Sequence, residues 1–246
     1  MRETIHRKIT GSMTAGIEGE KDEIETPLFA INWFNTRFAF VYHFYNLLVA
    51  GRVFKVGGKL LFKGKCQQAI SGNKDFARHY LLIVNYPSGH RFLDLLADRP
   101  FQLMSVFRTV SVKRFSFVLQ KRLGVPQLLP GGKVGFDPND HYAVLQVRFP
   151  KGDRQAAASS FDFDQLELLA EQHELQLFFA GRVAGTVFLK KNNSDKSDAL
   201  PFLTDITVVI RTPARNKIPE FFASKGLEKL LSSCSDFFAA HVERSW

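Results

Sequence analysis

Two stretches of the chain repeat one order of apolar runs, turn residues and amphipathic segments. In the first, residues 79–107, an apolar run from Tyr80 to Tyr86 leads through Pro87-Ser88-Gly89 into an amphipathic segment. An apolar run of this length between turn residues predicts a buried strand, and Ser88 can cap the helix that follows. Pro100 predicts a break in that helix. Residues 206–231 show the same order of strand, proline, helix and break.

The pattern before and after residues 79–107 completes a first repeat. We expect strands at 28–34, 59–66 and 111–120, and a helix over 37–56 that Gly57-Gly58 ends. That helix is apolar over so wide an arc that we expect it to be buried on more than one side. The resulting order is β-α-β-β-α-β, which is the ferredoxin-like order.

The pattern of the second half predicts the same order of elements. Strands are expected at 142–149, 175–190 and 202–211, and helices at 161–174 and 216–235, whereas 237–246 fits either a strand or the end of a helix. We therefore divide the chain into a flexible tail (1–26), a first repeat (27–123), a Gly/Pro-rich linker (124–140) and a diverged second repeat (141–246). Residues 192–201 have the composition of a surface loop.

The repeated order resembles the dimeric α+β barrel superfamily. The first half resembles one family of this superfamily, which consists of short bacterial proteins of unknown function. The matching residues are 56–64, 82–88, 92–93, 98–102 and 108. The resemblance implies an α+β fold in which two ferredoxin-like sheets of one chain close face to face. The chain would then be a monomeric pseudo-dimer or a homodimer of such units. The superfamily includes cofactor-free monooxygenases, haem-degrading enzymes, isomerases and ligand binders, so the fold leaves the function open.

Composition narrows the class of protein. The chain is 45% hydrophobic and 23% charged, as in soluble globular proteins, and its 25 Phe predict an aromatic core. Cys66 and Cys234 are too few for a disulfide framework and are expected to be buried thiols. No Cys/His spacing suits a metal, and we expect no cofactor. Without a secretory signal or an apolar stretch long enough to span a bilayer, we expect a cytoplasmic protein with no membrane partner.

Positive charge is concentrated in the first repeat. The formal net charge is +9, but residues 26–136 alone carry +13, and each flanking part carries −2. This asymmetry favours a negatively charged ligand or partner for the first repeat.

Strand alternation suggests a site in that repeat. We expect the uninterrupted apolar faces to meet the helices, which leaves Asn32, Lys63 and Asn85 on the opposite, barrel-facing side. Trp33 and Arg108 are weaker candidates nearby. A buried lysine without an acid on the same strands suits an anionic ligand. The alternative is a structural role, with the polar groups bonded to one another, to water or to backbone, and Lys63 reaching outward.

Three classes of function follow from these features. We favour binding or conversion of a small anionic or aromatic molecule in the barrel cavity of the first repeat. Whether there is catalysis stays open, since neither a nucleophile elbow nor a phosphate loop is visible. Nucleic-acid binding through the basic runs is less favoured, because the RNA-recognition strand signature is absent and a closed barrel would hide the sheet face. The third class is a non-catalytic scaffold whose basic first repeat docks an acidic partner.

Overall fold

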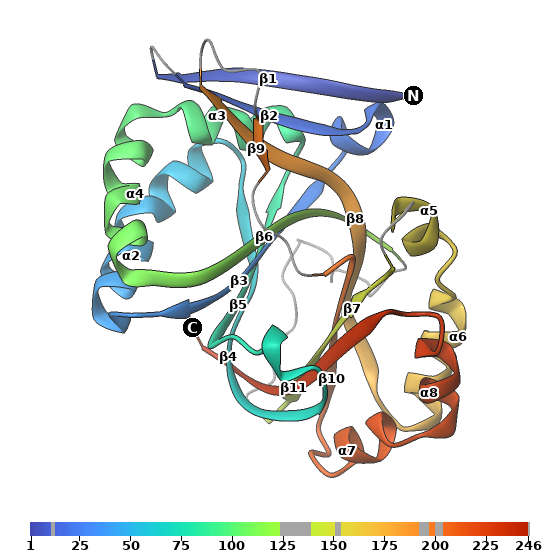
Figure 1. The fold of residues 1–246 in the computed structure, drawn as a ribbon. Helices are drawn as coiled ribbons and strands as arrows, with labels where there is room; N and C mark the ends of the chain where they lie inside the picture. The colour runs from blue at the N-terminus through green and yellow to red at the C-terminus, as the bar shows by residue number, and fades with distance from the viewer. Residues whose placement is uncertain (11–12, 124–138, 151–153, 192–196, 200–203, 246) are drawn as a thin grey trace. The chain divides into compact units, whose positions relative to one another are not determined.

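Figure 1 shows the fold in a computed structural model of the chain. The structure describes every residue except 11–12, 124–138, 151–153, 192–196, 200–203 and 246. The predicted linker therefore lies almost entirely outside the described residues. The described chain divides into two compact units, which are Met1–Lys63 with Arg78–Lys121 and Ala184–Phe202, and Gly64–Ala77 with Arg122–Val183 and Leu203–Trp246.

The first unit holds the first predicted repeat and the N-terminal segment. Its elements are β1 (Arg2–Thr10), β2 (Met13–Glu20), α1 (Lys21–Ile24), β3 (Leu28–Thr36), α2 (Ala39–Lys55), β5 (Tyr80–Tyr86), α3 (Gly89–Ala97), α4 (Arg99–Ser111), β6 (Val112–Arg122) and β9 (Ser197–Ala199). The long strands β4 (Lys59–Gly72) and β8 (Gln176–Lys191) contribute residues to both units.

The second unit holds most of the second repeat. Its elements are η1 (Lys74–Phe76), β7 (His141–Arg148), α5 (Arg154–Ser159), α6 (Phe163–Gln172), β10 (Ile206–Thr212), α7 (Lys217–Phe222), α8 (Lys225–Leu231) and β11 (Asp236–Arg244). The C-terminal stretch that the sequence left open is thus a strand. The predicted loop at 192–201 contains the short strand β9, which pairs with β8.

Both repeats have the predicted α+β order. The first runs β3-α2-β4-β5-α3/α4-β6, and the second runs β7-α5/α6-β8-β10-α7/α8-β11. The hydrogen-bonded strand order is β1-β2-β8-β10-β7-β11-β4-β5-β3-β6, and β6 also pairs with β8.

Local chemistry places the helix ends where the sequence predicts them. The Ser88 hydroxyl accepts a hydrogen bond from the Arg91 backbone N–H at 3.4 Å and caps α3. The Asp98 carboxylate accepts one from the Phe101 N–H at 3.1 Å and caps α4, whose first turn contains Pro100. Proline lacks the N–H that a continuous helix would need there, so α3 and α4 are separate helices.

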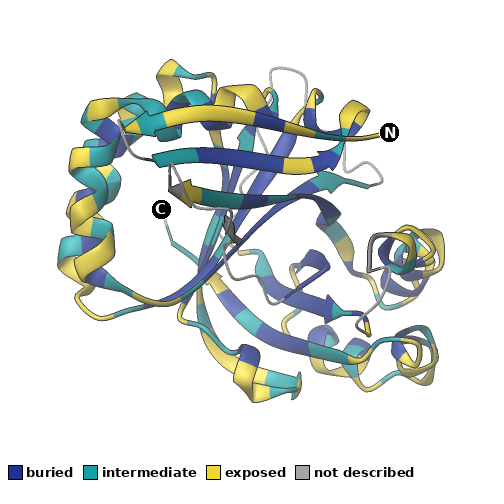
Figure 2. Cartoon of the chain, turned by 45° about the horizontal axis from the view of Figure 1, so that its top comes forward, coloured by how far each residue is buried: buried dark blue, intermediate teal, exposed yellow. Residues whose placement is uncertain are grey.

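In the first unit, β3 lies between β5 and β6, with antiparallel pairing on both sides. One face of these strands packs against the helices through a core that includes Phe34, Tyr42, Tyr86, Phe92 and Phe117. Figure 2 shows the strands mostly buried and the outer surfaces of the helices exposed. Cys66 and Cys234 are free and half-buried rather than buried.

The expectation that residues 1–26 form a flexible tail is wrong. Strands β1 and β2 form an antiparallel hairpin, and β2 continues the pairing with β8 between Met13–Lys191 and Gly19–Gly185. Ile5, Ile17 and Ile24 are buried in the core of the first unit. Ile17 packs closely on α3, since a Cβ on Gly89 would lie 3.1 Å from its Cδ1. Three buried isoleucines fix this segment, although its polar composition suggested a tail.

Substituting Ile17→Ala should therefore lower the free energy of unfolding by roughly 2–5 kcal/mol, the usual cost of removing a fully buried branched side chain. Urea denaturation followed by circular dichroism measures the change. Thr4→Ala on the exposed side of the same hairpin is the matched control and should have little effect. If Ile17→Ala had the same free energy of unfolding as Thr4→Ala, the burial of Ile17 would contribute nothing to the stability of the fold.

Candidate functional site

The first unit has a cavity of about 490 Å³, open to one side, between its sheet and its helices. Strands β3, β5 and β6 form one wall, and helices α2, α3 and α4 form the other. Most of the lining side chains are apolar, and none is Asp or Glu. Its polar side chains include those of Asn32, Tyr45, Asn46, Gln102, Ser105, Arg108 and Thr109.

Several of these polar groups already have partners within the protein. The Gln102 amide donates to the backbone carbonyls of Leu96 at 2.9 Å and Ile9 at 3.1 Å. The Ser105 hydroxyl donates to the Phe101 carbonyl at 2.8 Å. The Asn32 amide donates to the Ala30 carbonyl at 3.3 Å. Gln102 thus links α4 to β1 and α3, whereas Ser105 and Asn32 bond within their own elements.

Arg108 differs from them. It projects from α4 into the cavity and is half-buried, with its guanidinium carbon 5.0 Å from the centroid of the Phe115 ring. Within the described part of the chain it has no carboxylate partner, whereas Arg52 lies 3.8 Å from Asp98. A cation–π contact replaces only part of the hydration that a guanidinium loses on burial. The cavity thus holds a positive charge that no acid balances.

The tyrosines near Arg108 are neutral hydrogen-bonding groups. Burial raises the pKa of Tyr45, while the charge of Arg108 and a hydrogen bond with Ser105 oppose that shift. Burial also raises the pKa of Tyr42 and Tyr86, again against the effect of Arg108. At neutral pH these phenols therefore keep their protons and act as donors or acceptors rather than as bases. The cavity offers apolar walls, neutral hydroxyls and one cation.

The five residues singled out from the sequence do not form one cluster. Asn32 and Arg108 both line the cavity, but Lys63, Trp33 and Asn85 are not among its lining residues. Trp33 is almost fully buried, with 1% of its surface exposed. Lys63 is half-buried beside α2, with its Nζ 3.5 Å from Nδ1 of His43.

The expectation that Asn32 and Asn85 share a face is wrong. Asn32 pairs with Leu82, and Asn85 pairs with Phe29, three positions away along β3. Since alternate residues of a strand point to opposite faces, Asn32 lies on the helix-facing side and Asn85 on the other. Asn85 donates instead to the Leu28 carbonyl at 3.4 Å. Both faces of β3 are largely buried, so the apolar pattern could not identify the side that meets the helices.

Two other features of the described residues bear on function. No group of three or more His, Cys, Asp or Glu among them could hold a metal ion. No helix in the same part of the chain is long and apolar enough to cross a membrane.

Comparisons with known proteins concern the fold. No protein-family model matches the chain, and no curated protein does. A solved anthrone oxidase-like protein aligns over 94% of this chain and 94% of its own, with 12% identity and a TM-score of 0.50. The chain has the dimeric α+β barrel fold. A mutant chlorite dismutase from Candidatus Nitrospira defluvii shares this fold, with 12% identity over 92% of this chain and 95% of its own, and a TM-score of 0.50.

A shorter likeness involves a protein of unknown function from Rhodopseudomonas palustris. It is 21% identical over 41% of this chain and 85% of its own, with a TM-score of 0.39. At these identities the comparisons concern only the dimeric α+β barrel fold, so a function has to be argued from the site itself.

The position of Lys63 can be tested through His43. Burial lowers the pKa of His43, and the positive charge of Lys63 lowers it further. Substituting Lys63→Met removes that charge, which favours the imidazolium, so the pKa of His43 should rise. NMR titration of the histidine ring protons measures it. Lys59→Met is the control, because Lys59 is an exposed residue of the same strand. If Lys63→Met left the pKa of His43 unchanged, the contact between Lys63 and His43 would be contradicted.

Proposed function

We propose that the protein binds a small, largely apolar molecule with an anionic group in the cavity of the first unit. The observation that carries this proposal is Arg108, a half-buried cation facing apolar walls without a carboxylate partner among the described residues. A carboxylate or sulfonate on the ligand would form charge-assisted hydrogen bonds with the guanidinium. Asn32, which the sequence predicted on the barrel-facing side, lines this cavity from the helix-facing side instead.

The size and lining of the cavity support a ligand rather than trapped water. Its volume of about 490 Å³ lies within the ~300–1,000 Å³ typical of small-molecule sites. Aromatic walls such as Phe92, Phe115 and Phe117 suit an aromatic or aliphatic body. The net charge of +13 over residues 26–136 would attract an anion to this unit and repel a cation.

Binding of 1-naphthoate, an aromatic carboxylate, tests the proposal by isothermal titration calorimetry. Arg108→Gln should weaken binding by roughly 10- to 100-fold, because a hydrogen bond to a charged group contributes about 1.5–3 kcal/mol. Arg108→Lys should retain part of the affinity, since it keeps the charge but loses the planar fork.

Arg91→Gln is the matched control, because Arg91 lies on α3 beside Asp94 at 3.8 Å and does not line the cavity. The uncharged 1-naphthalenemethanol should bind the native protein weakly and should be insensitive to Arg108→Gln. Equal affinity of the native protein and Arg108→Gln for 1-naphthoate would refute the role of Arg108.

The outer surface of the first unit favours a second function, docking of a partner protein. Helices α2 and α4 lie side by side and expose a row of large apolar side chains. Phe44 of α2 and Phe107 of α4 contact each other edge to face, with their ring centroids 5.8 Å apart. Phe40 is 83% exposed, Leu47 78% and Leu103 74%. The other members of this apolar face are Phe44, Phe54, Val106, Phe107 and Val110. Soluble proteins rarely expose so many neighbouring apolar groups without a partner.

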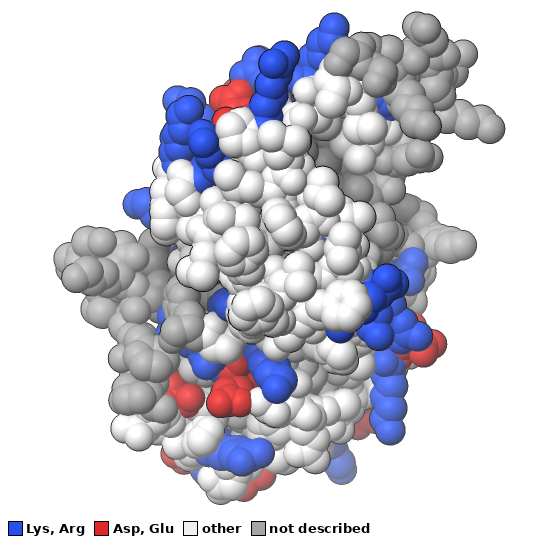
Figure 3. Space-filling model, turned by 90° about the vertical axis from the view of Figure 1, so that its left-hand side faces the viewer, with Lys and Arg blue, Asp and Glu red and all other residues white. Residues whose placement is uncertain are grey.

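The charges around the apolar face specify the partner. Neither α2 nor α4 contains an Asp or Glu, and both carry bases, including Lys55 and Arg99. Figure 3 shows an uncharged area on this side of the molecule, with Lys and Arg and fewer Asp and Glu around it. A second copy placed symmetrically on this face would bring like charges together, which disfavours self-association. We infer that the occupant is an acidic amphipathic helix, whose apolar side would lie along α2 and α4.

A synthetic amphipathic helix with leucines on one face and glutamates on the other tests this docking. The double variant Leu47→Ser/Leu103→Ser should weaken its binding by at least about tenfold in fluorescence anisotropy, since two exposed apolar contacts are lost. Leu168→Ser is the matched control, because Leu168 is 48% exposed on α6 of the second unit.

The same peptide with lysines in place of glutamates should bind poorly. Two results would contradict the acidic-helix proposal: equal binding of both peptides, or a native dimer in sedimentation that the double variant converts to monomer. The second result would assign the apolar face to a second copy of the chain.

A further inference from the structure

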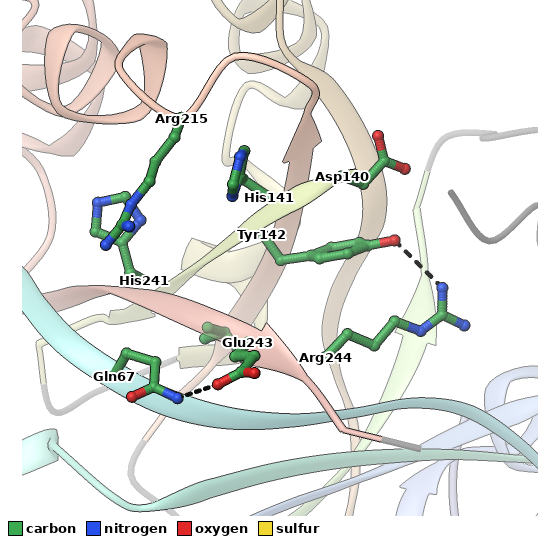
Figure 4. A pocket seen from close by; sticks show the side chains of 9 residues that line it. Gln67, Asp140, His141, Tyr142, Arg215, His241, Glu243 and Arg244 are labelled. Carbon is green, nitrogen blue, oxygen red and sulfur yellow. Dashed lines mark hydrogen bonds between the residues drawn. The ribbon is translucent and has the colours of Figure 1, made fainter. Parts of the chain in front are cut away.

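The second unit has a cavity of its own, of about 510 Å³, with a different chemistry. It lies at the end of strands β7 and β11, and Figure 4 shows its polar side chains. The lining residues central to its chemistry are His141, Arg215, His241, Asp140, Glu243 and Arg244. The sequence did not suggest a site here, because the second half has lost the polar positions of the first.

Strand register brings His141 and His241 together. His241 of β11 lies directly opposite Ala143 of β7, and His141 is two positions from Ala143 on the same strand. Residues two apart on a strand share a face, so the two histidines are diagonal neighbours on one face, with Cα atoms about 7–8 Å apart. Ala143 and Glu243 are their neighbours on the same face.

Arg215 reaches the same place from the turn after β10. Thr212 at the end of β10 lies opposite His141, and the chain then turns through residues 213–216 into α7. Figure 4 shows the Arg215 side chain pointing toward His241, and the charge of Arg215 and the neighbouring His141 both act on His241. Three nitrogen-rich side chains from three different segments thus converge on one side of the cavity.

The remaining charged groups of the cavity are engaged with one another or with neighbours. Arg244 donates to the Tyr142 hydroxyl at 3.2 Å. Asp140 lies 3.8 Å from Arg211, and the Gln67 amide donates to the Glu243 carboxylate. Among the described residues, no side chain accepts a hydrogen bond from His141, Arg215 or His241, and no carboxylate forms an ion pair with them. Their donors are available to a ligand.

The electrostatics of the cluster favour an anion. Burial lowers the pKa of His241, and the nearby Arg215 and His141 lower it further. The acids of the cavity are Asp140, which is paired with Arg211, and Glu243, which accepts a hydrogen bond from the neutral Gln67 amide and keeps its charge. The anion would therefore bind on the side of His141, Arg215 and His241, and Glu243 would oppose it. An anion between the three side chains would offset their mutual repulsion and favour the protonated imidazoles.

We propose that His141, Arg215 and His241 form a binding site for a tetrahedral oxyanion, the phosphate or sulfate group of a small molecule. The guanidinium can contact two oxygens at once, and each imidazolium can donate one further hydrogen bond. The cavity leaves room for the rest of the molecule, and Arg244 with Tyr142 would border it. This site goes beyond the ligand of the first unit, which is mainly apolar.

Sulfate is the probe for the test, because it stays a dianion across the pH range in which histidines titrate. NMR titration of the native protein at constant ionic strength should show that sulfate raises the pKa of His241 relative to chloride. Affinity for sulfate should accordingly increase as the pH falls through the histidine range, since binding and protonation are linked. Inorganic phosphate should compete with sulfate.

Arg215→Gln should weaken sulfate binding by at least about tenfold and remove the sulfate-dependent rise in the pKa of His241. Lys229→Gln is the matched control, because it removes the same charge from an exposed position on α8 outside the cavity. Equal pKa shifts in sulfate and chloride, or equal losses of affinity in both variants, would overturn the proposal and leave only general screening of the basic surface.

Discussion

The antiparallel register of β3 determines which side chains reach the cavity of the first unit. Asn32 lies opposite Leu82 on β5 and Phe117 on β6, and all three line that cavity. A slip of one residue would turn Asn32 away and bring Ile31 or the bulky Trp33 to the helix-facing side. The pairing of these three strands therefore determines which side chains line the cavity wall. Arg108 on α4 faces that wall from the opposite side of the cavity.

The parts of the fold that were predictable are those that depend on nearby residues. Ser88 and Asp98 cap their helices by accepting hydrogen bonds from backbone groups three positions later, so the residue type and spacing suffice to recognise them. Pro100 separates α3 from α4 for an equally local reason. The β-α-β-β-α-β order follows from such signals, because each one locates the end of an element.

The parts that were missed depend on partners far away in the sequence. Ile17 is buried because β2 pairs with residues 185–191 of β8 and packs on α3, and neither partner can be read from residues 1–26. Asn32 and Asn85 were placed on one face because apolar alternation says little about a strand buried on both sides. His141 and His241 meet only through the pairing of β7 with β11, and the sequence did not settle whether residues 237–246 form a strand. Non-local pairing thus accounts for each of these errors.

The apolar arc of α2 connects the sequence pattern with the unpartnered surface. The pattern predicts burial on more than one side, but the first unit covers only one side of α2, through Tyr42, Tyr45 and Val49. Phe40 and Leu47 lie on the uncovered side, where each exposed side chain forgoes the roughly 1.5–3 kcal/mol that burial would contribute. Helix α6 of the second unit exposes only Leu168 among its large apolar residues, so the wide arc is no requirement of the repeated fold. The wide apolar arc therefore marks the first repeat alone, and this difference between the two repeats is the physical basis on which we propose a partner for α2 and α4.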